Sequence, residues 1–300
     1  MFRVLAAIVL LLFLVMPVGA EPTPRQIMVL LNAADDAQQR FFQAFQSHRV
    51  ALGKPVEIIQ QGGITAAPTG DLVVAVGTRA CLSLLESQSK VPVVCTLVPR
   101  LAVAEALSTY SGQATALYLD QPFQRQLNLL EQILPHAREV GFVAGPTSQK
   151  VEPELATALQ GKGLRLHSLP YHRGDNIVSV LQRFDPIDVM LAYPDPVVFS
   201  AENIYPLLLT TYHQNIPTLG FSSAFVDAGA LAAVFSTPEQ LGVQTAETVA
   251  QWLTTGQWPR PQHPRQFTVR TNAQVAKSLR LAIPSEQELQ RQLTALEKLP

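Results

Sequence analysis

The sequence predicts an α/β protein of two doubly wound lobes, each built on a parallel sheet, joined by a hinge. Short aliphatic runs alternate with longer segments of helical periodicity along the chain. The runs are apolar at nearly every position, which is typical of strands covered by helices on both faces of a parallel sheet. The 300 residues also exceed what one hydrophobic core usually supports, which favours two lobes.

The first lobe is predicted from the alternating elements before residue 120. Its expected strands are residues 26–32, 55–60, 71–76, 91–98 and 114–119. Its expected helices are residues 35–52 and 78–85, the second of which follows the turn and cap at Gly77 and Thr78.

The alternation restarts at Asp120, which is expected to cap a helix that Pro135 ends. The further strands expected are residues 139–144, 165–170, 188–193, 217–221 and 231–236. The further helices expected are residues 151–160, 175–184 and 203–215. Thr237 and Pro238 then predict the cap and first position of a helix that ends near residue 255. A proline-rich connector, a strand at 267–270 and terminal helices are expected after it.

The N-terminal residues predict export. One cation, Arg3, precedes an unbroken apolar run over residues 4–16, which is typical of a secretory signal peptide. The run is shorter than the ~20 residues of a spanning helix. Small residues at Val18 and Ala20 predict cleavage after Ala20. The sequence therefore predicts a periplasmic protein with a signal peptide at residues 1–20, and an uncleaved anchor is the alternative.

Charge and cysteine content narrow the class of partner. The 22 Lys and Arg against 23 Asp and Glu give a net charge of -1, with no block of like charge. This argues against nucleic-acid binding and favours a small-molecule partner. Cys81 and Cys95 have neither zinc-binding nor redox spacing. In an oxidising compartment they can form a disulfide, and two buried free thiols are the alternative.

Motifs for catalysis are incomplete. The segment from Gly220 to Ala224 lacks the second glycine of a G-x-S-x-G nucleophile elbow. The Gly161–Gly163 segment lacks the glycine spacing of a phosphate loop, and no histidine pair has H-E-x-x-H spacing. We therefore expect no enzyme, no cofactor and no metal, with a hydrolytic enzyme as a weaker alternative.

Several blocks of sequence together resemble one family. They are SGQATALYLDQPFQRQLNLLEQILPHAREVGFVAGP from Ser111, PTLGFSSAFVDAGALAAV from Pro217, EQLGVQTAETVAQWLTTG from Glu239 and FTVRTNAQVAKSLRLAIP from Phe267. Their order and spacing resemble the ABC transporter substrate-binding protein family, in its uncharacterised periplasmic component group. The resemblance implies a type I periplasmic binding protein-like fold, with two lobes joined by three crossovers.

The resemblance also implies how the chain divides between the lobes. The helix from Pro238 would return to the first lobe, and the strand near Phe267 to the second. The predicted N-terminal lobe is residues 21–115 plus 237–258, and the C-terminal lobe is residues 116–236 plus 264–300. Hinge segments are expected at residues 112–119, near Ser236 and at 259–266.

The binding site is expected beyond the carboxyl ends of the strands, where ligands of open parallel sheets lie. The candidates are Asn32, Gly77, Thr78 and Thr96 in the first lobe, and Thr147, Tyr171, Asp195, Phe221, Ser222 and Phe225 across the cleft. Some have structural alternatives. Thr78 could only cap its helix, Asp195 could bind a ligand ammonium or end a turn, and Phe225 could pack in the core.

The function predicted from these observations is capture of a small ligand by hinge closure. The protein is expected to be a monomer, and its closed form would deliver the ligand to an inner-membrane ABC permease. The alternative is a ligand sensor that presents its closed form to a receptor.

Overall fold

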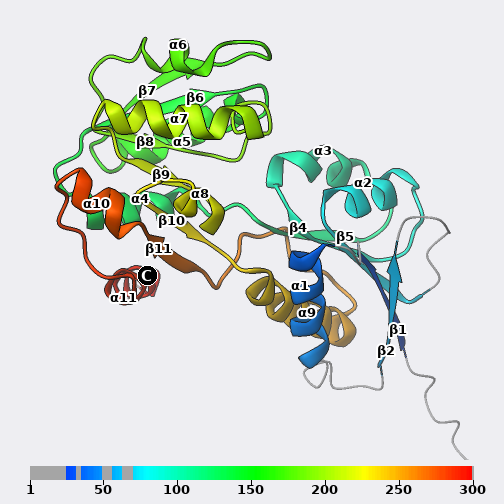
Figure 1. Cartoon of the computed structure of the whole chain (residues 1–300). Helices are drawn as coiled ribbons and strands as arrows, with labels where there is room; N and C mark the ends of the chain where they lie inside the picture. The colour runs from blue at the N-terminus through cyan, green and yellow to red at the C-terminus, as the bar shows by residue number, and fades with distance from the viewer. Residues whose placement is uncertain (1–24, 32–34, 49–55, 63–69, 299–300) are drawn as a thin grey trace, which may run out of the picture.

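The chain folds into two α/β lobes (Figure 1). The computed structural model describes residues 25–31, 35–48, 56–62 and 70–298. The predicted signal peptide and Asn32 lie outside these residues. No helix in the described part of the chain is long and apolar enough to cross a membrane.

Within the described residues, the first lobe has a five-stranded parallel sheet in the order β2-β1-β3-β4-β5. Its strands are β1 (Arg25–Leu31), β2 (Val56–Gly62), β3 (Leu72–Val76), β4 (Val93–Val98) and β5 (Ala114–Tyr118). Its helices are α1 (Asp36–Ser47), α2 (Thr78–Glu86), α3 (Arg100–Thr109) and α9 (Pro238–Thr255). One face of the sheet packs with α1 and α9, and the other with α2 and α3.

The second lobe has, in the same described part, a six-stranded sheet in the order β11-β10-β9-β8-β6-β7. Its strands are β6 (Glu139–Ala144), β7 (Arg165–Pro170), β8 (Val189–Leu191), β9 (Thr218–Gly220), β10 (Ala232–Phe235) and β11 (Thr268–Thr271). Only β11, at one edge, pairs antiparallel in this sheet as described.

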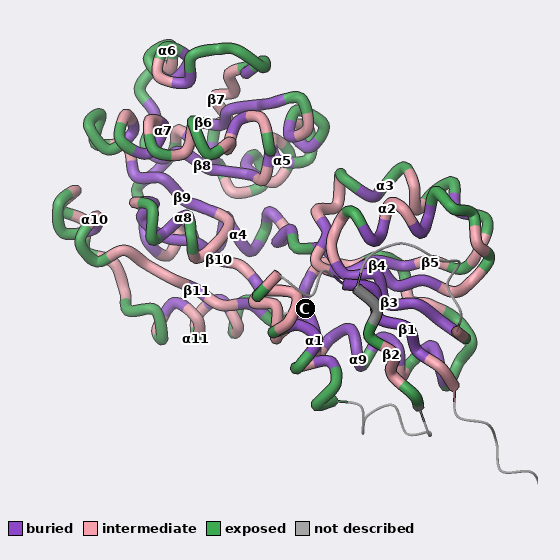
Figure 2. Tube along the Cα trace, turned by 45° about the vertical axis from the view of Figure 1, so that its right-hand side comes forward, coloured by how far each residue is buried: buried purple, intermediate pink, exposed green. Residues whose placement is uncertain are grey.

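Helices cover both faces of this second sheet. They are α4 (Phe123–Ile133), α5 (Glu152–Gln160), α6 (Ile177–Leu181), α7 (Ala201–His213), α8 (Ser223–Asp227), α10 (Ala273–Ser278) and α11 (Glu286–Leu296), and a 3-10 helix at Ser148–Val151 precedes α5. One core lies on the side of α4, α5 and α11, and the other on the side of α6, α7 and α8. Buried residues concentrate in the strands of both sheets (Figure 2). The predicted fold class is therefore confirmed.

Three segments connect the lobes. The chain crosses between β5 and α4, between β10 and α9, and between α9 and β11. The third crossing is bonded to the end of β5 by two hydrogen bonds: the Tyr118 amide donates to the Gln262 carbonyl at 3.0 Å, and the Gln262 amide to the Ala116 carbonyl at 2.9 Å. It also contacts the first crossing, where the His263 ring lies 2.8 Å from the Asp120 carbonyl. The Ser236 hydroxyl, in the second crossing, donates to the Gln266 carbonyl at 2.6 Å. The three crossings therefore form one bonded bundle.

The strand β5 forms one edge of the first sheet. It pairs with β4 as far as the partners Val98 and Tyr118. The first sheet therefore extends three residues beyond residue 115, where the boundary was placed. The helix α9 packs against α1 and β4, and β11 pairs with β10. The helix α9 thus packs in the first lobe and β11 in the second, and the predicted lobe boundaries stay predictions.

Two predicted helix starts differ from the structure. Pro122, not Asp120, is the N-cap of α4. Gly77 is the N-cap of α2, and Thr78 is its first helical residue rather than a cap. By contrast, Thr237 does cap α9, since its side chain accepts from the Gln240 amide and the Gln240 side chain bonds back.

Two helices were not predicted. In α3 only Val103 is buried, so the segment lacks the apolar stripe by which periodicity is recognised. The helix α8 has five residues, too few to show a period. It begins where Ser222 accepts a hydrogen bond from the Phe225 amide.

The cysteine pair is joined. Cys81, in α2, and Cys95, in β4, form a disulfide. Both residues are fully buried. Of the two alternatives that the sequence left open, the structure has the bonded one.

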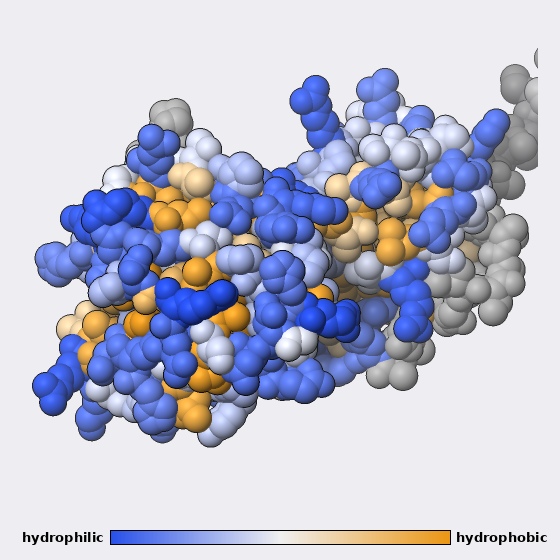
Figure 3. All heavy atoms as spheres, turned by 90° about the horizontal axis from the view of Figure 1, so that it is seen from above, coloured by the Kyte–Doolittle hydropathy of each residue, from blue (hydrophilic) through white to orange (hydrophobic). Residues whose placement is uncertain are grey.

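Hydrophilic residues cover most of the face seen from above, and the apolar residues visible between them occur over both lobes (Figure 3). On α7, the side chains of Tyr205, Leu209 and Tyr212 are exposed at helical spacing. The Tyr212 hydroxyl is hydrogen bonded to the hydroxyl of Ser278, the last residue of α10. One of these three exposed side chains therefore contacts α10.

Candidate ligand-binding site

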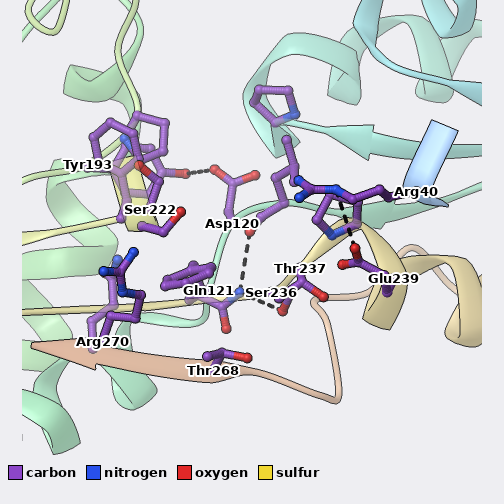
Figure 4. Close-up of a pocket in the computed structure, with 18 residues that line it drawn as sticks. Arg40, Asp120, Gln121, Tyr193, Ser222, Ser236, Thr237, Glu239, Thr268 and Arg270 are labelled. Carbon is purple, nitrogen blue, oxygen red and sulfur yellow. Dashed lines mark hydrogen bonds and ion pairs between the residues drawn. The ribbon is translucent and has the colours of Figure 1, made fainter. Parts of the chain in front are cut away.

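A cavity of about 550 Å³ lies between the lobes (Figure 4). Residues from both lobes and from two crossings line it: Arg40, Pro99, Leu119, Asp120, Gln121, Gln126, Tyr193, Pro194, Phe221, Ser222, Ser223, Phe235, Ser236, Thr237, Pro238, Glu239, Thr268 and Arg270. Most follow the carboxyl ends of β4, β5, β8, β9 and β10. The cavity therefore has the position expected for a ligand of open parallel sheets.

The first-lobe wall is formed by α1 and the first turn of α9. Arg40 from α1 lies 3.3 Å from the Glu239 carboxylate of α9 and 3.6 Å from the carboxylate of Asp36, one turn earlier in α1. Arg40 and Glu239 are each about half exposed, at 50% and 46%. The charges of this wall are thus paired in the structure (Figure 4).

The floor of the cavity is the first crossing. Both carboxylate oxygens of Asp120 are occupied: Oδ2 accepts from the Arg100 amide at 2.5 Å, and Oδ1 from the Tyr193 hydroxyl at 2.8 Å. Asp120 is 4% exposed. Such a buried carboxylate is stable only where hydrogen bonds replace its hydration. Its bonds connect the crossing to the start of α3 in the first lobe and to the segment after β8 in the second.

The neighbouring Gln121 connects the crossings. Its Nε2 donates to the Ser236 hydroxyl at 3.0 Å, and its Oε1 accepts from Arg125 at 2.6 Å. Arg125 is 5% exposed, pairs with Glu297 and donates to the Pro264 carbonyl at 2.9 Å. The floor is therefore a hydrogen-bonded network rather than a loose linker.

Tyr193 has the strongest shift of pKa near the cavity. Burial, followed by the neighbouring charge and hydrogen bond of Asp120, raises the pKa of Tyr193 well above its ordinary value. The phenol therefore stays neutral and acts as a hydrogen-bond donor at neutral pH.

The second-lobe wall combines aromatic, hydroxyl and cationic groups. Phe221 packs on Phe225 with ring centroids 5.0 Å apart, and Ser222 and Ser223 follow it. Arg270, from β11, points toward the cavity and also lies 2.9 Å from Asp227 (Figure 4). A mostly apolar wall with a few orienting polar groups is typical of small-molecule sites.

One buried polar group at the cavity lacks a partner. Gln126, from α4, lines the cavity and is 3% exposed. Its Oε1 is buried and accepts no hydrogen bond from the described residues. Most buried side-chain oxygens have a partner, which makes this one unusual.

Of the predicted site residues, Phe221 and Ser222 line the cavity. Gly77 and Thr78 lie half-buried at the start of α2 and are not among its lining residues. Thr96 is fully buried, and the Thr245 hydroxyl donates to it at 3.2 Å. The roles of these residues toward a ligand stay predictions.

The remaining candidates are bonded within the second lobe, outside the cavity. Asp195 accepts from the amides of Thr147 and Ser148 at 2.9 and 2.7 Å, and from the amides of Val197 and Val198 at 2.9 and 3.3 Å.

The Tyr171 hydroxyl donates to the Asp175 carbonyl at 2.9 Å. Phe225 is 3% exposed and packs in the core. These contacts support structural roles for Asp195, Tyr171 and Phe225 in this state of the protein.

Sequence reasoning missed most of the polar lining. Asp120 and Thr237 were interpreted as helix caps and Ser236 as a hinge. Tyr193 follows a strand, so the rule of carboxyl ends could have found it. Arg40 and Arg270 carried no such signal, because they project from a helix and an antiparallel edge strand. Among the described residues no group of three or more His, Cys, Asp or Glu could hold a metal ion.

Two lobes with mainly parallel sheets, three crossings and a cavity between them define a type I periplasmic binding protein fold. The chain belongs to the ABC transporter substrate binding protein family, whose model matches residues 41–288. The resemblance noted in the sequence is therefore confirmed. Members of this family are substrate-binding proteins. No curated protein matches the chain.

Solved structures share the fold. A ligand-free, open substrate-binding protein with adhesive properties from Clostridium difficile has a TM-score of 0.69 and 17% identity, over 88% of this chain and 97% of that one. An ABC domain in complex with L-Trp from Streptococcus pneumonia has a TM-score of 0.62 and 19% identity, over 88% and 97%. A conserved domain protein from Vibrio cholerae has a TM-score of 0.62 and 21% identity, over 87% and 96%. Such low identities establish the fold alone.

Proposed function

We propose that this protein is a monomer that captures a small solute in the periplasm and delivers it to the permease of an ABC importer. The cavity between the lobes is the observation that carries the proposal. Its lining comes from both lobes, so that a solute inside would contact both. A solute that binds the closed arrangement more tightly than the open one favours closure by that difference in affinity. The closed shape is then what the permease recognises.

The lining also limits the class of solute. Its charged groups are Arg40 and Arg270 against Asp120 and Glu239. These charges cancel, and burying an unpaired ionic charge is costly. Apolar side chains form much of the remaining lining: Pro99, Leu119, Pro194, Phe221, Phe235 and Pro238. We therefore propose a solute with no net charge and a substantial apolar part.

A thermal-shift panel on the purified mature protein tests this. The neutral probes are L-leucine, L-phenylalanine, L-tryptophan, adenosine, uridine, glucose and galactose, and the charged ones are L-aspartate, L-lysine, phosphate and sulfate. A probe at 100 times its dissociation constant adds about 2.7 kcal/mol of stability, which raises the melting temperature by several degrees. We expect shifts from neutral probes only, with compaction in small-angle scattering. Shifts from charged probes alone would contradict the proposed solute class, and none from any probe would contradict the function.

Native mass spectrometry and genomic context test the remaining parts. The mature chain is expected to begin at Glu21 and to have the mass of a monomer. Neighbouring genes for an ATPase and a permease are expected, whereas a neighbouring sensor kinase would favour a sensor.

A further inference from the structure

We propose that Gln126 is a ligand-binding residue of the interlobe cavity, and that the solute donates an N–H or O–H hydrogen bond to its side-chain carbonyl. The inference rests on the proposed solute-binding function. It adds a specificity-determining residue and a chemical requirement on the solute.

The first observation is an unmet hydrogen-bond requirement. The Oε1 atom of Gln126 is buried without a partner, and the residue is 3% exposed. Leaving a buried acceptor unpaired costs stability in the ligand-free protein. Such a cost is typical of a site that completes its hydrogen bonds with a ligand.

The second observation is its location. Gln126 lies among the lining residues of the cavity, on the first helix after the floor formed by Asp120 and Gln121. Those two neighbours have their side-chain oxygens occupied by protein donors: Asp120 by Arg100 and Tyr193, and Gln121 by Arg125. Of these three side chains, Gln126 is therefore the one whose oxygen has no protein donor, and its residue lines the cavity.

The same helix offers a matched control. Gln124 lies two residues before Gln126, is exposed and is not among the cavity-lining residues. Its Nε2 donates to Asn128 at 3.1 Å. Replacing either glutamine by methionine keeps the chain length and helix propensity and removes the amide.

The experiment measures probe affinity and the urea midpoint of the mature protein and of Gln126→Met and Gln124→Met, using the neutral probes named above. For each probe that binds the unmodified protein, we expect Gln126→Met to weaken the affinity about tenfold or more. The urea midpoint of the ligand-free variant is expected to be unchanged or higher, because an unpaired acceptor has been removed. Gln124→Met is expected to keep the affinity.

The outcomes separate the two proposals. If a probe binds the unmodified protein and Gln126→Met equally well, the role of Gln126 is wrong and solute binding stands. A lower urea midpoint for Gln126→Met would also overturn the role of Gln126. It would mean that the amide has a structural partner in the ligand-free protein, such as a buried water, which the variant loses. If no probe binds the unmodified protein, the proposed function fails, and this inference with it.

A methylated form of each bound probe, in which one N–H or O–H donor is blocked, tests the donor requirement. Blocking the relevant donor is expected to weaken binding to the unmodified protein and to have little effect on Gln126→Met. If blocking each donor in turn weakened binding equally in the unmodified protein and in Gln126→Met, the assigned hydrogen bond would be wrong.

Discussion

Tyr193 donates a 2.8 Å hydrogen bond to Asp120, and this bond connects the second lobe to the first crossing. The other oxygen of Asp120 accepts from the Arg100 amide at the start of α3, in the first lobe. One carboxylate thus holds groups from both lobes at the floor of the cavity. Both Tyr193 and Asp120 are nearly fully buried, so water cannot readily replace either bond.

Tyr193→Phe is expected to lower the free energy of unfolding by about 2 kcal/mol at pH 7, because the carboxylate of Asp120 loses a buried donor. Burial and Asp120 raise the pKa of Tyr193 in the folded protein, whereas an unfolded tyrosine loses its proton at about pH 10. The contribution of this phenol is therefore complete below about pH 10 and falls as the pH rises above it.

Urea unfolding of both proteins between pH 7 and 11 measures this effect. We expect the difference between them to shrink above about pH 10. Tyr205→Phe is the control. Tyr205 is 68% exposed, so this substitution should leave the free energy of unfolding unchanged between pH 7 and pH 11. A difference that stayed constant through pH 11 would contradict the role given to the phenol.

Asp195→Asn is expected to destabilise the second lobe. Burial alone would raise the pKa of Asp195, but hydrogen bonds from Ser148, Val197 and Val198 outweigh it and hold the pKa below its ordinary value. An asparagine would turn an N–H₂ group toward some of these donors. We expect a loss of about 3 kcal/mol in unfolding free energy at pH 7.

The pH dependence of this loss has a definite sign. A carboxylate with a lowered folded pKa stabilises fully above its unfolded value of about 3.9, and this contribution disappears as the pH falls through the folded value. Urea unfolding at pH 7 and at pH 3 should therefore show a smaller loss at pH 3. Asp185→Asn, on the exposed surface, is the control. An equal loss at both pH values would mean that the charge of Asp195 is not responsible.

Much of the fold could be predicted from the sequence because the strands of doubly wound sheets are apolar on both faces. Residues 72–76 and 93–95 are buried at every position, and the sequence shows them as unbroken apolar runs. The elements that were missed, α3 and α8, bury too few residues to give a periodic signal. The strand β11 was expected, at residues 267–270, but its antiparallel direction is set by tertiary pairing with β10, which local sequence does not encode.

The candidate site was less predictable. Phe221 and Ser222 could be found because they follow a strand at the edge where ligands bind. Arg40 and Glu239 come from helices far apart in sequence, and only the packing of α1 on α9 brings them together. The missing partner of Gln126 is likewise a property of packing. Neither could be inferred from residue type or spacing.

The disulfide between Cys81 and Cys95 is expected to stabilise the first lobe. The cysteines are 14 residues apart, and closing a loop of that length contributes about 3 kcal/mol. The double variant Cys81→Ala/Cys95→Ala should lose about this much unfolding free energy, measured in urea without reductant. Adding reductant to the unfolded state of the unmodified protein should reproduce the loss and leave the variant unchanged. A reductant effect on the variant would mean that the bond is not its cause.

Gly242→Ala is expected to disrupt the packing of α9 on α1, which positions Glu239 beside Arg40 at the cavity wall. A Cβ atom at Gly242 would lie 2.5 Å from the Phe41 carbonyl oxygen and 3.0 Å from the Phe45 amide nitrogen. Backbone atoms cannot yield as a flexible side chain can, so the helices must move apart. This costs about 2 kcal/mol, more than the ~1 kcal/mol that alanine gains in a helix.

Gly161→Ala, at the end of α5, is the matched substitution. Gly161 has φ -60°, and its nearest neighbours for a Cβ atom lie at 3.5 and 3.6 Å, so alanine fits without strain. It should raise the free energy of unfolding by about 0.5 kcal/mol by restricting the unfolded chain. Urea unfolding of the two variants should thus give changes of opposite sign. If Gly242→Ala were as stable as Gly161→Ala, the close approach of α1 and α9 would not limit which residue this position accepts.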